Sequence, residues 1–501
     1  MHVEASPRAV PAATLATLLG SAATAIAVGV RRGDGTDGAK HPAAARGSSA
    51  LARQIGVDVP AVAAAEHAGT SAGDLTRVPG LSAAAKIFLV GVGDGSPPEL
   101  RAAAAALARS VRRVDRIVTS LGAGGGNEAA QAAAEGVLLG AYRVGREGTK
   151  AGEDAPGARV VQLVGADDGA VRRGVIEAGA TVLARELANT RSSTKGPSWL
   201  AARARRLART RDLRERVWTE VDLRRDGFGG LLAVGGGAAR GPRLVQLDYL
   251  PTGGPAGKRA HVVLVGKGIT FDTGGISLKP REAMVGMTTD MTGAAVVLAV
   301  LASCRDLGVR ARVTGLLPLA ENAIGAGSYR PGDVVRMYDG TTVEVRNTDA
   351  EGRMVLADAL GYARRELRPE LLVDVATLTG AATQSLGRTH AALYSTSERL
   401  AAGLQRAGDA AGERLWRMPL VEDYRELIDS DIADLCQITT RPPVGAGSVM
   451  AALFLREFAG DVPWAHLDIA GPGRSDRDKG EVNRGGTGFG ARVLLRWLAT
   501  L

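Results

Sequence analysis

Residues 340–367 read GTTVEVRNTDAEGRMVLADALGYARREL: a predicted strand, a short turn and a predicted helix. The β-branched run is typical of a strand, and the apolar residues after the turn recur at helical spacing. The turn, residues 347–353, carries Asp349, Glu351 and Arg353 at alternate positions. These groups either form an ordinary solvated surface or face a charged ligand, and the turn alone leaves both interpretations open.

The same alternation of strand and helix extends outward along the chain. The remaining residues from about 189 to 501 contain six further apolar runs that predict strands, at 230–236, 243–250, 260–266, 311–318, 371–379 and 464–471. Helical patterns separate several of them, which predicts a largely parallel sheet covered on both faces. Residues 1–170 show the same rhythm with Ala-rich helices. We therefore expect an α/β fold of two domains, each a mixed, largely parallel sheet flanked by helices, with the larger domain C-terminal.

Chain length supports this division, because a single hydrophobic core rarely extends over as many as 501 residues. We expect an N-terminal α/β domain at 1–170, a linker helix at 171–188 and a larger C-terminal domain at 189–501. The first domain shows no cluster of catalytic residue types, so we assign it a role in assembly or regulation.

Composition excludes several kinds of site. Hydrophobic residues make up 45% of the chain, as in globular proteins, and aromatic residues only 4%, which weakens any interpretation based on stacking with nucleic acid. The two cysteines form no C-x-x-C pair, which fits a reducing cytoplasm. The six histidines are scattered, with no H-E-x-x-H motif. Any metal must therefore be held mainly by carboxylates.

An apolar stretch at residues 9–30 resembles a signal peptide in composition. It contains Pro11, and Glu4 lies where a signal peptide would be positively charged. We therefore favour a buried helix that leads into a strand at 24–30. No other run approaches a membrane span in length and apolarity, so no membrane association is expected.

The net charge of +9 is unevenly distributed. Residues 171–240 hold 15 basic and 7 acidic groups, whereas residues 241–501 hold 30 of each. Much of the excess lies in the Arg-rich segment 203–216, RARRLARTRDLRER. A solvated helix face is one interpretation, and a patch for DNA or an acidic partner is the other.

Ionisable and small polar residues follow the predicted strands of the larger domain. In α/β sheets the ligand lies beyond the carboxyl ends of the strands. The residues at these positions are Lys267, Asp272, Lys279, Asp290, Glu321, Asn322, Asp349, Glu351, Arg353, Thr377, Thr379 and Gly380.

Four carboxylates brought together would repel one another and raise each other's pKa, so a cation must offset them. Two lysines and an arginine are candidates, and so are metal ions. Divalent metals prefer carboxylate oxygens, and two ions about 3.5–4 Å apart form a site for hydrolysis. A lysine joins such a site only as the free amine, with its usual pKa of about 10.4 lowered by neighbouring cations and by burial.

Five segments together resemble one family. They read VGKGITFDTGGISLKP (265–280), DMTGAA (290–295), NTDAEGR (347–353), ATLTGA (376–381) and WAHLDIAG (464–471). They are similar, in order and spacing, to the signature blocks of the cytosolic leucyl aminopeptidases, the two-metal peptidase family M17. The resemblance covers residues 189–501, and residues 1–170 match far less.

The resemblance implies a set of metal ligands. Lys267, Asp272, Asp290 and Glu351 would hold the tighter ion. Asp272, Glu351 and Asp349 would hold a more exchangeable one, with Asp272 and Glu351 bridging the two.

The resemblance also implies catalytic and substrate-binding residues. Lys279 would polarise the scissile carbonyl or stabilise the gem-diolate oxygen. Arg353 would bind a bicarbonate ion that serves as general base. Thr377 and Gly380 would line the substrate site.

The implied activity is a metal-dependent aminopeptidase that uses a two-metal-activated hydroxide. It would release leucine and other apolar N-terminal residues from short peptides, with two divalent ions, Mn or Zn, per subunit. The resemblance further implies a homohexamer built as a dimer of trimers and a cytoplasmic location. Two alternatives stay open: a DNA-binding or scaffold role of segment 203–216, with or without peptidase activity, and another two-metal hydrolase such as a phosphoesterase.

The sequence departs from the family pattern at a few positions. Thr273 stands where many relatives have Ser, Thr288 and Thr289 stand where relatives often have a basic residue, and residues 189–197 read NTRSSTKGP. These departures bear on substrate preference and local stability, because every implied ligand is present.

Several other polar residues are predicted to have supporting roles. We expect Glu321 and Asn322 to support the neighbouring loop, and His261 and His466 to be packed or hydrogen-bonded residues of the sheet. Asp468 follows an apolar run and is expected to cap the next turn.

Overall fold

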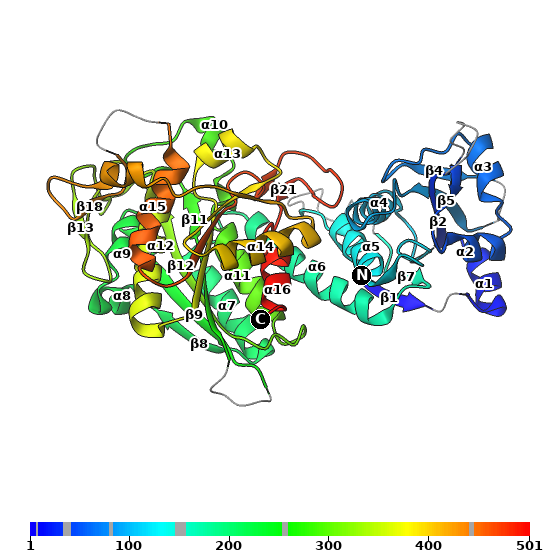
Figure 1. The fold of residues 1–501 in the computed structure, drawn as a ribbon, viewed down its shortest axis with the longest axis horizontal. Coiled ribbons are helices and arrows are strands. Elements are labelled where there is room, and N and C mark those ends of the chain that lie inside the picture. The colour runs from blue at the N-terminus through cyan, green and yellow to red at the C-terminus, as the bar shows by residue number, and fades with distance from the viewer. Residues whose placement is uncertain (7–8, 34–41, 80–83, 146–156, 253–258, 440–444) are drawn as a thin grey trace. The chain divides into compact units, whose positions relative to one another are not determined.

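The computed structural model describes residues 1–6, 9–33, 42–79, 84–145, 157–252, 259–439 and 445–501. The chain divides into two compact units, drawn in Figure 1. Unit 1 comprises Met1–Val182 and Asp476–Arg484, and unit 2 comprises Leu183–Ser475 and Gly485–Leu501. Helix α6 (Asp168–Asn189) contains both the boundary at Val182 and the predicted helix at 171–188.

Unit 1 is built around a mixed sheet. Its strands lie in the order β1 (His2–Ser6), β7 (Val160–Val164), β6 (Arg116–Thr119), β2 (Thr24–Arg32), β5 (Lys86–Gly91) and β4 (Leu75–Val78). The neighbours from β1 to β5 are parallel, whereas β4 is antiparallel to β5 and β3 (Pro42–Ala44) is antiparallel to β2.

Helices cover both faces of this sheet. Helices α4 (Pro97–Ser110) and α5 (Gly126–Ala141) pack on one face, and α1 (Ala12–Leu19), α2 (Ser48–Gln54) and α3 (Val59–Ala65) pack on the other (Figure 1). Helix α1 buries Leu15 and Leu18 and is followed by β2, as predicted for residues 9–30.

Unit 2 contains the larger mixed sheet. Its order is β17 (Leu415–Arg417), β16 (Ala391–Ser395), β19 (Trp464–Asp468), β15 (Leu371–Ala376), β10 (His261–Gly266), β12 (Arg312–Asn322), β9 (Arg243–Tyr249) and β8 (Arg214–Trp218). The central strands β19, β15, β10 and β12 are parallel, and β11 (Gly268–Asp272) extends the pairing with β12. The parallel centre places the carboxyl ends of these strands at one edge.

Helices also cover both faces of the larger sheet. Helices α11 (Thr292–Ser303) and α16 (Ala491–Leu498) pack on one face, and α9 (Gly229–Gly235), α12 (Glu351–Tyr362) and α15 (Gly447–Ala459) pack on the other (Figure 1). The two units together confirm the predicted α/β class. Among the described residues, no helix has the length and apolar character needed to span a membrane.

Two predicted strands of the larger sheet are wrong. Residues 230–236 form helix α9, which buries Leu231 and Val234, because periodicity does not distinguish a short apolar strand from a buried helix. The strand expected at 341–347 is only β14 (Thr342–Glu344). It lies in a separate small sheet with β13 (Val334–Arg336) and β18 (Leu435–Cys436), so residues 347–353 do not follow a strand of the main sheet.

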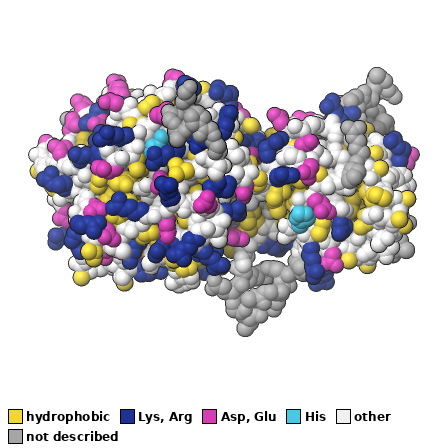
Figure 2. All heavy atoms as spheres, turned by 90° about the horizontal axis from the view of Figure 1, so that it is seen from below, with side chains coloured by type: hydrophobic (Ala, Val, Ile, Leu, Met, Phe, Trp, Pro, Cys, Tyr) yellow, Lys and Arg dark blue, Asp and Glu magenta, His cyan; other side chains and the backbone are white. Residues whose placement is uncertain are grey.

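The Arg-rich segment 203–216 forms the end of α7 (Pro197–Arg211) and part of β8. Several of its guanidinium groups are paired with acids, which favours a solvated helix face over a patch for DNA. Figure 2 shows both basic and acidic side chains on the face it presents, with basic side chains gathered along part of its lower edge. The ion pairs are Arg205–Glu215 at 3.2 Å, Arg211–Asp306 at 2.7 Å and Arg216–Asp226 at 3.5 Å.

Candidate metal centre and active site

Three buried carboxylates converge at the carboxyl edge of the unit 2 sheet. Asp272 ends β11, Asp290 lies just before α11, and Glu351 is the first residue of α12. One carboxylate oxygen from each lies within 4.8 Å of the others. Asp272 thus comes from a strand of the main sheet, whereas Glu351 comes from the helix that follows strand β14 (Thr342–Glu344) of the small sheet.

Lys267 lies between two of these carboxylates, in the link from β10 to β11. Its Nζ is 3.0 Å from Asp290 Oδ2 and 2.9 Å from Glu351 Oε1, and it donates to the main-chain oxygen of Thr377 at 3.0 Å. Burial by itself would lower the pKa of Lys267, but the surrounding carboxylates raise it overall. In this arrangement Lys267 is a fully paired ammonium.

A close backbone approach brings Asp290 to Lys267. A Cβ on Gly293, in the first turn of α11, would lie 2.1 Å from the main-chain oxygen of Val375. The amide of Ala294 donates to the main-chain oxygen of Lys267 at 2.8 Å. Gly293 therefore lets the start of α11 pack directly on β15, which fixes the position of Asp290.

Lys279 and Asp349 form the outer part of the site. Lys279 Nζ is 2.8 Å from Asp272 Oδ2 and also contacts Asp349 Oδ1. Thr348 ties the two loops together: its Oγ1 donates to the main-chain oxygen of Gly274 at 2.6 Å and accepts from the amide of Ser277 at 2.8 Å. Lys279 and Asp349 are thereby held over the buried carboxylates.

Gln437 holds the turn at residues 347–353, and no pattern in the sequence predicts this role. Its Oε1 accepts from the amides of Arg346 at 2.8 Å and Asn347 at 2.9 Å, and its Nε2 donates to the main-chain oxygen of Ala350 at 3.2 Å. Its main-chain oxygen accepts from Nη1 of Arg353 at 2.5 Å. Pairing of β18 with β14 brings Gln437 there, and that pairing joins segments far apart in the sequence.

The acids of the site outnumber its lysines. Burial, together with repulsion from Asp272, raises the pKa of Glu351 to about 8 and also raises the pKa of Asp349. Burial is also the main cause that raises the pKa of Asp290 to about 6. The cluster therefore lacks positive charge, and additional cations would restore these carboxyl groups to the ionised form.

The donor atoms fit a divalent metal. Glu351 Oε2 is buried and has no hydrogen-bond partner among the described residues. Buried polar atoms in native proteins are nearly always paired, so this oxygen indicates a ligand. Carboxylate oxygens are the donors that Mg²⁺, Mn²⁺ and, with nitrogen ligands, Zn²⁺ accept.

A cavity of about 530 Å³ opens on this cluster. Eight of the nine residues singled out for metal, catalysis or substrate line it: Lys267, Asp272, Lys279, Asp290, Asp349, Glu351, Thr377 and Gly380. The ninth, Arg353, is buried in α12, two residues beyond Glu351, and is not part of this lining. Burial lowers the pKa of Arg353 to about 10, and its Nε is unpaired within the described part of the chain.

Asp468 supports the substrate-facing segment at 377–380. Its carboxylate accepts from the amides of Leu378 and Thr379, both at 3.1 Å, and from Thr379 Oγ1 at 2.6 Å. Thr379 in turn caps α13 (Gly380–Leu386), and Thr377 Oγ1 donates to Asp290 Oδ1 at 2.8 Å. The prediction that Asp468 caps the following turn therefore understated its role, because it orients a segment that contacts the cluster.

The structure also confirms the predicted supporting residues. Asn322 Nδ2 donates to Asp272 Oδ1 at 2.8 Å and to the main-chain oxygen of Thr348 at 2.9 Å. Glu321 pairs with Arg240 at 2.8 Å. The two sheet histidines are hydrogen-bonded in the core: His261 Nε2 with Thr314 Oγ1 at 3.0 Å, and His466 Nδ1 with Asp374 Oδ1 at 2.5 Å.

The chain resembles known proteins in both sequence and structure. The model of the cytosol aminopeptidase family catalytic domain matches residues 182–495, and that of the family's N-terminal domain matches residues 27–150. A probable cytosol aminopeptidase of Roseiflexus castenholzii is 42% identical over 83% of this chain and 87% of its own length.

Two solved structures extend the likeness over nearly the whole chain. The bottromycin maturation enzyme BotP, in complex with Mn, is 38% identical with a TM-score of 0.81, covering 96% of this chain and 99% of its own. A mutant tomato leucine aminopeptidase is 27% identical with a TM-score of 0.84, covering 100% of this chain and 97% of its own. Matches over both units, in sequence and in structure, show that the chain belongs to the cytosol aminopeptidase family, peptidase family M17.

Proposed function

We propose that this chain is a metal-dependent aminopeptidase that releases leucine and other apolar residues from the N-termini of short peptides. Membership of the family supports a peptidase hydrolase. The observation that carries the metal dependence is the buried acid cluster, in which Glu351 Oε2 has no partner within the described residues. A manganese complex of the relative BotP supports divalent metal use in the family.

We assign two metal positions to the cluster. Lys267, Asp272, Asp290 and Glu351 would hold the tighter ion, and Asp272, Asp349 and Glu351 the more exchangeable one. We propose that both ions are Mn or Zn. Bound metal would act as a Lewis acid and lower the pKa of a water molecule. To serve as a ligand Lys267 must give up a proton, and metal charge beside its Nζ would reverse the upward shift that the carboxylates now cause.

The chain's own residues orient and stabilise the reacting groups. The neighbouring carboxylates keep Lys279 cationic, since they raise its pKa although burial alone would lower it. The ammonium is thus positioned to meet negative charge that develops on the scissile carbonyl. We also propose that the Arg353 guanidinium binds a bicarbonate ion, and that this ion serves as the general base. The unpaired Nε of Arg353 supports this role.

The lining of the cavity supports an apolar first residue. Ala283, Met287 and Leu378 line it together with Thr377 and Gly380. A volume of about 530 Å³ is in the range of small-ligand pockets, which is suited to the end of a peptide. The free α-amino group of the peptide would bind at the exchangeable metal position, so that cleavage is confined to the first residue.

Three further proposals concern location and assembly. The first two rest on the family resemblance, and the third rests on the lack of clustered catalytic residue types in the sequence of residues 1–170. We propose a cytoplasmic location, a homohexamer arranged as a dimer of trimers, and an assembly or regulatory role for the N-terminal domain. A closed assembly of this kind would limit access to short peptides. The alternative of a DNA-binding role receives no support from the comparisons, and the ion pairs of segment 203–216 weigh against it.

A metal analysis combined with a dipeptide panel tests the proposed function. We expect the purified protein with Mn²⁺ or Zn²⁺ to release N-terminal leucine, with slower release of charged residues, and chelation to abolish the activity. Phenyl phosphate serves as the control substrate for the phosphoesterase alternative. Hydrolysis of phenyl phosphate without hydrolysis of leucyl peptides would contradict the proposal.

A further inference from the structure

Unit 1 contains a cavity that the proposed peptidase chemistry does not use. Its volume is about 430 Å³, within the range of about 300–1,000 Å³ typical of ligand pockets. Its walls come from the ends of β2, β5 and β6, the segments that follow them, and the loop between β3 and α2. All of these belong to unit 1.

The topology of the unit 1 sheet places this cavity where α/β proteins bind ligands. Strands β6, β2 and β5 are adjacent and parallel, so their carboxyl ends share one edge. The chain leaving β2 goes on to α2 and α3 on one face, whereas the chain leaving β6 enters α5 on the other. Such a point of divergence between neighbouring strands is the usual position of a ligand crevice.

Polar groups of different kinds converge on the cavity. Arg31, at the carboxyl end of β2, and the exposed Arg46 supply positive charge. Ser48 and Ser120 are fully buried and place their hydroxyls 2.8 Å apart in its wall. Asp94 adds a carboxylate on the side of β5. Cations, hydroxyls and a single acid together suit a ligand with anionic and hydroxyl groups.

The segment after β6 lines the cavity with glycine-rich backbone. It reads GAGGG at residues 122–126 and leads directly into α5, whose N-cap Gly125 makes no side-chain capping hydrogen bond. Gly122 has φ of +84°, and a Cβ there would lie 2.8 Å from the main-chain oxygen of Ala129. The first amides of a helix lack intrahelical acceptors and favour anions.

We propose that this cavity binds a small phosphorylated ligand of the nucleoside phosphate class. The phosphate lies against Arg31, Arg46 and the backbone of residues 122–125, which lead into α5. The ribose hydroxyls meet Asp94 and the serine pair. The apolar lining receives the base and consists of Val92, Leu100 and Leu121. This site is separate from the peptidase residues and does not depend on their assignment.

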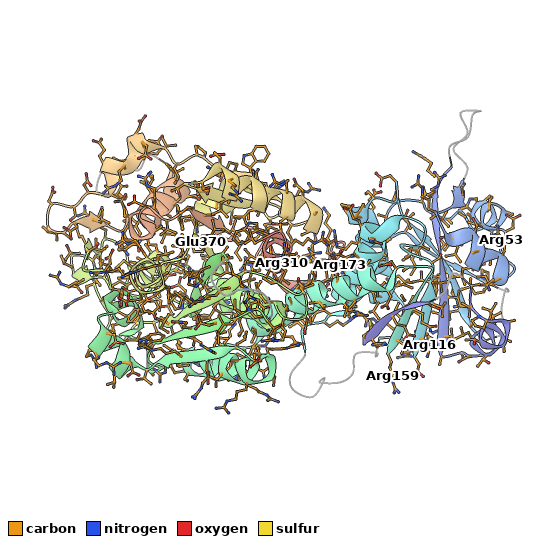
Figure 3. All side chains as sticks on the ribbon, turned by 60° about the horizontal axis from the view of Figure 1, so that its bottom comes forward. Arg53, Arg116, Arg159, Arg173, Arg310 and Glu370 are labelled. Carbon is orange, nitrogen blue, oxygen red and sulfur yellow. The ribbon has the colours of Figure 1, made fainter. Side chains whose placement is uncertain are left out.

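Titration calorimetry of the full chain with ADP, after removal of metal by EDTA, tests the proposal. Inorganic phosphate and adenosine are the comparison probes, because each carries only part of the ligand. The test variant is Arg31→Ala/Arg46→Ala. The matched control is Arg53→Ala/Arg159→Ala, which removes the same charge from unit 1 at positions outside the cavity lining: Figure 3 shows Arg53 on α2 and Arg159 at the amino ends of the strands.

We expect ADP to bind the wild type and the control equally, and more tightly than either phosphate or adenosine. Affinity should fall by about tenfold or more in the test variant, because charge-assisted contacts to phosphate are lost. An unchanged thermal unfolding curve would show that the test variant is folded, whatever its affinity for ADP. Absence of ADP binding at millimolar concentration, or equal weakening in both variants, would overturn the proposal, as would phosphate binding as tightly as ADP.

Discussion

Glu351 is the residue at which the electrostatics of the site are most unbalanced. It begins α12, where the helix dipole favours a negative charge, yet it is buried beside Asp272 and Asp290. Burial dominates and raises its pKa to about 8. One of its oxygens pairs with Lys267 while the other has no partner in the described structure. A divalent ion would resolve both features, which supports the proposal, implied by the family resemblance, that Glu351 belongs to both metal positions.

Glu351→Gln tests that placement at the residue scale. We expect a folded protein in which kcat/KM for a leucyl substrate falls more than about 100-fold, since even residues that only support metal ligands often cost about 10–100-fold. Asp349→Ala should behave in the same way. Glu398→Gln is the matched control, because that side chain is 87% exposed. Wild-type turnover in either site variant would show that the metal assignment is wrong.

Protons compete with metal for the same carboxylates. The pKa values of about 6 for Asp290 and about 8 for Glu351 mean that metal-free protein binds protons at neutral pH. Metal binding must release them, so we expect Mn²⁺ affinity to rise between pH 6 and 8, by up to about tenfold per pH unit for each proton released. Calorimetry in buffers of different ionisation enthalpy measures that release. Affinity that is independent of pH would contradict the shifted pKa values.

At the scale of elements, the site depends on short segments held by side chains from distant strands. Asp468, at the end of β19, fixes residues 377–380, and Gln437, after β18, fixes residues 347–353. The acids and lysines could be recognised in the sequence because their residue types match metal and oxyanion chemistry. Gln437 could not, because one glutamine has no local signature and reaches the turn only through the pairing of β14 with β18.

Asp468→Asn tests the support of residues 377–380. The variant keeps the size of the side chain but replaces one carboxylate oxygen with an amide group. That group cannot accept the hydrogen bond that the Thr379 hydroxyl or a backbone amide now donates. We expect kcat/KM to fall by about 10–100-fold and metal affinity to weaken, as for other supports of metal sites. Asp461→Asn, on an exposed turn, is the control. A loss of stability with unchanged kinetics would mean that Asp468 has only a packing role.

The buried pair of His466 and Asp374 predicts a pH dependence of stability. Burial alone would lower the pKa of His466, but Asp374, 2.5 Å away, raises it overall. The folded state therefore holds the proton more tightly than the unfolded state, whose histidine pKa is about 6.5. The resulting stabilisation is complete below about pH 6.5 and is lost as pH rises through the folded pKa.

Urea unfolding of wild type and His466→Gln at a series of pH values measures this effect. We expect the difference in unfolding free energy to be largest at low pH and to shrink as pH rises, by about 1.4 kcal/mol for each pH unit that separates the unfolded and folded pKa values. His2→Gln, an exposed histidine, is the control. A difference that stays constant with pH would mean that His466 has the same pKa in the folded and unfolded states, and a difference that grows with pH would mean that the folded state keeps His466 neutral.

At the scale of the whole molecule, the alternation of strand and helix was sufficient to predict two α/β domains. The strand predicted at 230–236 is wrong because a short run of apolar residues and glycines is compatible with both a strand and a buried helix. The turn at 347–353 was assigned to the wrong sheet, since strand pairing depends on contacts distant in sequence. The residues of the cluster nevertheless lie together, because Glu351 at the start of α12 and Asp272 at the end of β11 both lie at the carboxyl edge of the main sheet. The domain boundaries at 170 and 189 remain our prediction.

Metal should also stabilise unit 2 as a whole. An ion that binds the folded state at about 100 times its Kd adds about 2.7 kcal/mol to the unfolding free energy. We expect Mn²⁺ to raise the melting temperature of EDTA-treated wild type and to have little effect on Glu351→Gln. Equal increases in melting temperature in both proteins would show that the stabilising Mn²⁺ ion binds at a site without Glu351.

The release of leucine from a leucyl dipeptide, compared with its N-acetylated counterpart, tests the central claim most directly. The assay is run on EDTA-treated protein before and after Mn²⁺ is added. We predict leucine release only with metal and only from the peptide with a free amino group. Cleavage that persists after chelation, or equal cleavage of the acetylated peptide, would contradict the assignment of a metal-dependent aminopeptidase.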